Sequence, residues 1–236
     1  MKLAGILFLF SICLLLPARA DVTIVQTIEG DGSASQTTMK VKGDKIRFEA
    51  SPKLTTILEG KTGGMILLMN NEKRYRRISS AQTKAMAEMA NKFAAQKPAS
   101  EKLKLTPTGK KETINGYESE EYTSETAFYK ARYWLTTKYP NYVSILKQLQ
   151  NARPAALNLS KDIIIDYSEL PGLPIRTHVT IGGKEIMSTM KSIKEDPLPQ
   201  AEFSVPSDFQ EVKGPDMGSI DEQNEKNPAA ESSSKP

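Results

Sequence analysis

Signals for tight turns recur along the sequence between short segments in which apolar and polar residues alternate. The clearest turn signals are Gly43-Asp44, Asn115-Gly116 and Gly182-Gly183. Such pairs tolerate the positive φ angles of two-residue hairpins, so the strands on either side of them pair antiparallel. A parallel sheet would need a long crossover between strands instead. The sequence therefore predicts about ten strands in hairpin order.

Individual strands follow from composition and alternation. The segment 65–69 is apolar on both faces, which favours a central strand. Further extended segments are expected at 102–106, 110–114, 162–168 and 202–205.

Two amphipathic helices interrupt the strands. Ser79 and Gln82 fit a capping box at the start of a helix over 81–97, and a second helix is expected to begin near Pro140. The apolar stripe of the second helix consists of Tyr142, Ile145, Leu146 and Leu149. The fold class is therefore α+β, a large curved antiparallel sheet (a half-barrel) with both helices covering one face.

Both ends of the chain differ in composition from the middle. Residues 1–20 combine Lys2, an apolar run and Ala18-Arg19-Ala20, the layout of a secretory signal peptide cleaved between Ala20 and Asp21. We therefore expect a secreted or periplasmic protein with no transmembrane segment after cleavage. Residues 214–236 are acidic and poor in apolar side chains, which predicts a disordered tail. The folded domain is expected to span 21–213.

Removing residues 1–20 narrows the possible chemistry. The remainder has no cysteine, one histidine (His178), and 30 basic against 28 acidic residues. This composition disfavours disulfide scaffolds, thiol enzymes, cysteine-based zinc sites and strongly electrostatic binding of nucleic acid. His178 lacks a nucleophile motif nearby, and Glu118, Glu120 and Glu121 are expected on a solvated face. We predict no catalytic residues, metal or cofactor, and a hydrolase is the least favoured alternative.

Several short motifs resemble a known family. They are Thr108–Tyr117, which carries the Gly116-Tyr117 hairpin, then Tyr133-Trp134-Leu135, Gly172-Leu173-Pro174 and Phe203-Ser204-Val205-Pro206. Over about residues 22–213 they resemble a bacterial family of secreted domains of unknown function. The cysteine often found near the hairpin in that family is absent, since Ser119 and Glu120 stand there.

The order of elements in that family is similar to the periplasmic lipoprotein carriers LolA and LolB. That similarity implies a half-open antiparallel barrel whose concave apolar face receives acyl chains. No ligand-binding residue of the carriers can be matched here.

Soft apolar side chains are the candidate binding residues. Methionine adapts its shape to variable partners, which suits a cleft for acyl chains. The candidates are Met65, Leu67, Met69, Met86, Met89, Phe93 and Trp134. Ordinary packing of a helix on a sheet accounts for the same stripes, so a filled core is the alternative.

Two functions follow from these observations. The first is a non-enzymatic carrier for a lipid, an acyl chain or a lipidated protein, with helix 81–97 as a lid. The second is a cell-envelope domain that engages a protein partner through a sheet edge or the acidic tail. The basic run Lys73, Arg74, Arg76 and Arg77 fits contact with an anionic headgroup or an acidic partner surface, or a charged edge strand that resists aggregation. Contact with a membrane surface is also possible.

Overall fold

The computed structural model describes residues 21–95, 104–125, 129–152 and 166–213, and within them it forms one sheet of twelve strands. The strands are β1 (Val22–Gly30), β2 (Ser33–Lys42), β3 (Lys45–Ser51), β4 (Leu54–Glu59), β5 (Met65–Met69), β6 (Arg74–Ile78), β7 (Thr106–Ile114), β8 (Tyr117–Glu125), β9 (Tyr129–Thr136), β10 (Leu173–Ile181), β11 (Lys184–Lys194) and β12 (Gln210–Glu211). The predicted signal peptide and acidic tail lie outside the described residues.

The sheet is open, in the order β12-β6-β5-β4-β3-β2-β1-β11-β10-β9-β8-β7. From β1 to β6 and from β7 to β11, consecutive strands pair antiparallel, and the antiparallel pair β1 and β11 joins these two halves. Only β12 pairs parallel, with β6. The predicted turns are confirmed. Positive φ angles occur at Gly43, Asn115, Gly116, Gly182 and Gly183. The α+β class with a curved, mostly antiparallel sheet is therefore confirmed, with twelve strands where about ten were expected.

Four of the expected extended segments differ in the structure. The segments 102–106 and 110–114 were expected as separate strands, but Thr106–Ile114 is one strand, β7, with a bulge at Gly109 (φ 75°). The part of 162–168 that is described enters a 3-10 turn, Tyr167–Glu169, because Asp166 accepts hydrogen bonds from Ser168. The segment 202–205 likewise begins in a 3-10 turn, Gln200–Phe203.

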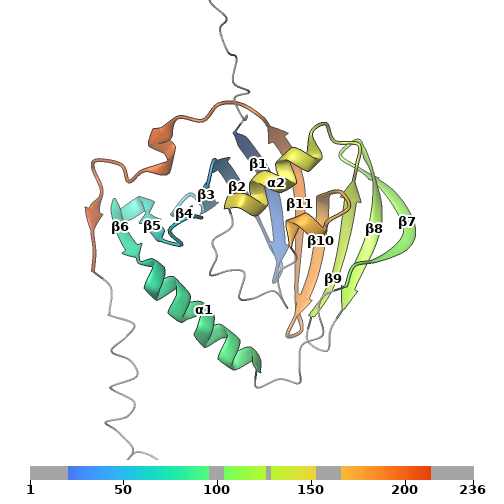
Figure 1. Ribbon diagram of the computed structural model, residues 1–236, viewed down its shortest axis with the longest axis horizontal. Helices are drawn as coiled ribbons and strands as arrows, with labels where there is room; N and C mark the ends of the chain where they lie inside the picture. Colours follow the sequence, from blue (N-terminus) through green and yellow to red (C-terminus); the bar gives the residue numbers. More distant parts are fainter. Residues whose placement is uncertain (1–20, 96–103, 126–128, 153–165, 214–236) are drawn as a thin grey trace, which may run out of the picture.

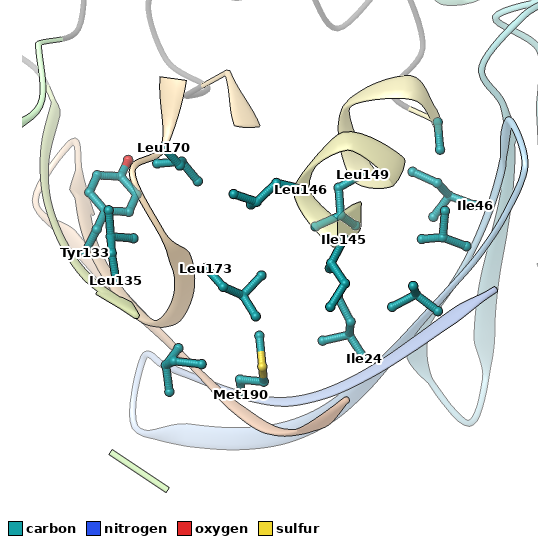
Figure 2. Close-up of a cluster of buried hydrophobic side chains, with 14 of the residues drawn as sticks. Ile24, Ile46, Tyr133, Leu135, Ile145, Leu146, Leu149, Leu170, Leu173 and Met190 are labelled. Atoms are coloured by element: carbon teal, nitrogen blue, oxygen red, sulfur yellow. The ribbon is translucent and has the colours of Figure 1, made fainter. Parts of the chain in front are cut away.

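The main core lies where helix α2 (Tyr142–Ala152) sits inside the curve of the sheet (Figure 1). Figure 2 shows Ile145, Leu146 and Leu149 of α2 between two walls of the sheet, one carrying Ile24 and Ile46 and the other Tyr133, Leu135 and Leu173. Full burial of each aliphatic side chain contributes roughly 1.5–3 kcal/mol. We call the side of the sheet that faces α2 the concave face and the other side the outer face.

Helix α1 (Ser80–Ala95) begins with the predicted capping box. The Gln82 backbone N–H donates to Ser79 Oγ at 3.2 Å, and the Ser79 backbone N–H donates to Gln82 Oε1 at 2.9 Å. These two bonds satisfy donors that a helix start leaves unpaired. From there α1 runs away from β6 across the open side of the curve (Figure 1).

A second, smaller core lies on the outer face. Ile57, Ile66 and Leu68 are buried there beneath Val205 and Phe209. These two residues belong to the C-terminal strap, residues 195–212, which passes from β11 over the outside of the sheet to β6 (Figure 1). The Phe-x-Val-Pro motif is thus a packing motif: Phe203 is buried, and Val205 covers the second core.

Candidate functional site

The concave face has two ends that differ in burial. We call the part packed against α2 the closed end, and the part beyond it the open end. At the closed end Val22, Ile145 and Leu173 have no measurable exposure. At the open end the side chains of Ile181 and Ile186 are each 44% exposed. The open end is therefore apolar surface that the described part of the chain leaves partly accessible.

The register of β3 to β6 shows how one end passes into the other. Residues directly opposite in antiparallel strands share a face. The row at the closed end consists of Ile46, Leu58, Met65 and Ile78. The next row consists of Phe48, Thr56, Leu67 and Arg76, and the last contains Leu54, Met69 and Arg74. Apolar side chains thus continue past α2 and end, on β6, in two arginines.

The structure brings three of the seven predicted binding residues together. Met65, Leu67 and Met69 all lie half-buried on the concave face of β5, while Ile66 and Leu68 point to the outer face. On α1, Met86 is 43% exposed and Met89 is 42% exposed. Phe93 lies in α1, but its side chain is outside what the structure describes. The binding role of these residues stays a prediction.

Trp134 lies away from the other candidates. Its neighbours Tyr133 and Leu135 point into the main core, so Trp134 faces outward, opposite Arg176 in the register. The guanidinium carbons of Arg132 and Arg176 are 5.9 and 5.5 Å from the centre of its ring, within cation–π range. Sequence alternation separates two sets of residues on β9, but both sets contain aromatics, so it does not show which set faces inward.

The outer face beside Trp134 carries a hollow of about 490 Å³. His178 lines it, with its Nδ1 2.8 Å from a guanidinium nitrogen of Arg132 and its Nε2 3.7 Å from Glu185. The arginine has only donors, so His178 Nδ1 accepts and the proton of the neutral ring lies on Nε2. His178 therefore serves a polar network on the surface.

Glu121 contradicts the expectation of a solvated acidic face. Its side chain is only 6% exposed, accepts a hydrogen bond from Thr108 Oγ1 at 3.0 Å and lies 3.8 Å from Lys110 Nζ. The β7 bulge brings both partners over it. Sequence alternation missed this because the bulge is a feature of β7, whereas Glu121 belongs to β8.

The basic run splits between the two faces of β6. Lys73 Nζ lies 3.0 Å from Asp208, and Arg77 Nε lies 3.7 Å from Glu211, so both pair with the C-terminal strap. The hydrogen bond to Lys73 holds the pKa of Asp208 below its ordinary value. Arg74 and Arg76 lie in register with Met69 and Leu67 on the concave face.

The sequence reasoning missed other accessible apolar residues of the concave face. They are Ile28, Phe48, Leu54, Ile181 and Ile186, all half-buried or exposed. Their alternation with polar neighbours is visible in the sequence, but only the register places them on the same face as Leu67 and Met69.

Comparison with known proteins identifies the family. The model of the domain of unknown function DUF4412 matches residues 21–209. The chain belongs to the DUF4412 family. No curated protein matches the DUF4412 chain in sequence.

Solved structures with a similar arrangement share little sequence with this DUF4412 protein. The lipoprotein LppX of Mycobacterium tuberculosis is 9% identical, with a TM-score of 0.38, over 75% of this chain and 88% of that one. A putative outer membrane lipoprotein-sorting protein domain from Vibrio parahaemolyticus is 14% identical, with a TM-score of 0.34, over 80% and 91%. PNGF-II is 12% identical, with a TM-score of 0.42, over 86% of this chain, which spans 33% of that protein.

None of the described helices has the length and apolar character needed to cross a membrane. Within the same residues, no three histidine, cysteine, aspartate or glutamate side chains group as potential metal ligands.

Proposed function

We propose that this domain binds a hydrophobic ligand, a lipid or the acyl chain of a lipidated protein, at the open end of the concave face, and that it does so without catalysis. The observation that carries the proposal is the continuation of apolar side chains past α2. Leu67, Met69 and Ile186 share the face of the main core but stay accessible. Burying an acyl chain there would contribute about 0.8 kcal/mol per methylene group.

The position and side chains of helix α1 support a role as a cover over this surface. It runs across the open side of the sheet and carries two methionines that are more than 40% exposed. Flexible, polarisable side chains adapt to chains of different length and branching. We therefore propose α1 as the movable cover. The layout of residues 1–20 supports a location outside the cytoplasm for this function.

The alternative, a domain that engages a protein partner through a sheet edge, receives less support. At one edge, β6 is already covered by β12, which has only two residues. The other, β7, is interrupted by the bulge at Gly109 and carries Pro107, Lys110 and Lys111, features that discourage strand addition. Neither edge offers a regular strand for a partner.

Titration of the purified domain with a BODIPY-labelled acyl probe tests the proposal. The variants Leu67→Ser and Met69→Ser should each weaken binding about tenfold, because each removes apolar contact from the open end. Ile186→Ser should also weaken binding. Met187→Ser is the matched control, because Met187 is next to Ile186 but points to the outer face.

The control should bind as the unaltered protein does. A probe that fails to bind, or that loses as much affinity with Met187→Ser as with Ile186→Ser, would show that the concave face is not the binding surface. Native mass spectrometry of the freshly purified protein should in addition detect a co-purified species of lipid mass.

A further inference from the structure

The two arginines at the open end indicate what kind of amphiphile fits there. On the concave face of β6, the residues change from Ile78 beside the closed end to Arg76 and then Arg74. Their partners on β5 are Met65, Leu67 and Met69. A ligand with its chain along β5 would therefore meet guanidinium groups at the end that lies farther from α2.

Arg74 can exchange its present contact. Its guanidinium lies 3.3 Å from Glu72, and the two side chains are 51% and 58% exposed. Surface pairs of this kind are screened by water and contribute little, so an anion can displace or share them. Arg76 is half-buried on the same face. An arginine beside apolar surface also binds carboxylate or phosphate in a two-pronged geometry that lysine cannot match.

The other two cations of the run form ion pairs with the C-terminal strap. Lys73 and Arg77 contact Asp208 and Glu211 of the C-terminal strap, and Arg77 also lies over the ring of Tyr75 at 5.3 Å. These contacts attach the strap to β6, and the register puts Arg77 on the outer face. The strap therefore accounts for the position of Lys73 and Arg77, whereas Arg74 and Arg76 are the cations of the run that lie on the concave face.

We infer that the open end selects an anionic amphiphile, an acyl chain whose negatively charged headgroup pairs with Arg74 and Arg76. This inference rests on the proposed function, since the chain itself would occupy the apolar surface. Glu72, the acidic side chain in contact with Arg74, would be the group the headgroup competes with. The anionic charge, rather than the chain length, would then distinguish bound from rejected lipids.

Competition of oleate and of uncharged monooleoylglycerol against the acyl probe tests the inference, because the two share one chain and differ in the headgroup. The unaltered protein should bind oleate more tightly. R74Q/R76Q should weaken oleate binding about tenfold and leave monooleoylglycerol within about twofold, as expected when a charge-assisted contact is lost. R77Q is the matched control and should change neither affinity.

The outcomes separate the inference from the proposed function. Equal binding of both lipids, unchanged in R74Q/R76Q, would overturn the anionic preference while leaving hydrophobic binding in place. An equal loss of oleate binding in R77Q would also overturn it, since general surface charge would then explain the effect. Failure of both lipids to bind would overturn both proposals. E72Q should strengthen oleate binding, and a weakening would contradict the assigned competition.

Discussion

The closed and open ends of the concave face are built from the same strands but differ in what covers them. A helix is about 10–12 Å across, whereas a strand of nine residues is about 30 Å long. One helix of eleven residues can therefore cover only part of the face. The backbones also approach closely at the closed end, where only glycine fits. A Cβ at Gly60 would lie 2.9 Å from the carbonyl oxygen of Ala152 at the end of α2.

The difference in cover assigns different roles to the side chains at the two ends. Side chains that α2 buries completely contribute to folding, while partly exposed side chains of the same type contribute less and stay available to a ligand. Under the proposed function, the filled end would stabilise the fold and the accessible end would bind the ligand. Substitutions at the two ends should therefore have opposite consequences.

The largest effect is expected from truncation at the closed end. Leu173→Ala should lower the free energy of unfolding by about 2–5 kcal/mol, because it leaves a cavity among fully buried neighbours. Ile186→Ala at the open end should cost less than about 1 kcal/mol, because the side chain is already 44% exposed. Urea unfolding followed by circular dichroism measures both. Similar costs for the two variants would remove the distinction between the ends.

A smaller effect should distinguish α1 from α2, the helix that is packed into the closed end. Ser79→Ala removes the side-chain oxygen that accepts from the Gln82 backbone N–H and should destabilise the start of α1 by about 1 kcal/mol. Hydrogen exchange should show faster opening of α1 amides, with little change in α2. Ser80→Ala, on the exposed next residue, is the control. Equal acceleration in both helices would mean that α1 unfolds only together with the main core.

The sequence predicts local features of the fold better than it predicts which side of a strand faces the core. Hairpins and caps depend on residues close together in the chain, so Asn115-Gly116 and the Ser79–Gln82 box were predicted and confirmed. Alternation on β9 separates Trp134 from Tyr133 but does not say which of them faces α2. That choice depends on the pairing of β9 with β10 and β8, strands whose contacts are set by the whole sheet.

The C-terminal strap is the clearest feature that local patterns miss. Its contacts join residues more than 100 positions apart, such as Lys40 with Glu202 at 2.5 Å and Tyr75 with Glu211 at 3.0 Å. In the sequence, 202–205 has the alternation of a strand, and Lys73 and Arg77 look like free surface cations. The sequence does not reveal their carboxylate partners, because these belong to the strap, which is distant in the chain but lies against β6 in the fold.

The smallest effect depends on pH and concerns two carboxylates. Asp208 lies in this strap, and Glu49 of β3 pairs with Lys40, which also contacts Glu202 of the strap. Burial raises the pKa of Glu49, but the hydrogen bond from Arg47 and the charge of Lys40 outweigh it, so the pKa lies below its ordinary 4.5. The pKa of Asp208 lies below its ordinary 3.8 because of Lys73.

A carboxylate with a lowered pKa in the folded state binds more protons when the protein is unfolded. Stability therefore rises with pH, and it is lost as the pH falls from these ordinary values through the folded ones. Glu49→Gln and Asp208→Asn should each flatten the acid side of a plot of unfolding free energy against pH, with Glu49→Gln having the larger effect because it is less exposed. Unchanged acid slopes in both variants would show that these two carboxylates do not contribute to the stability of the folded domain.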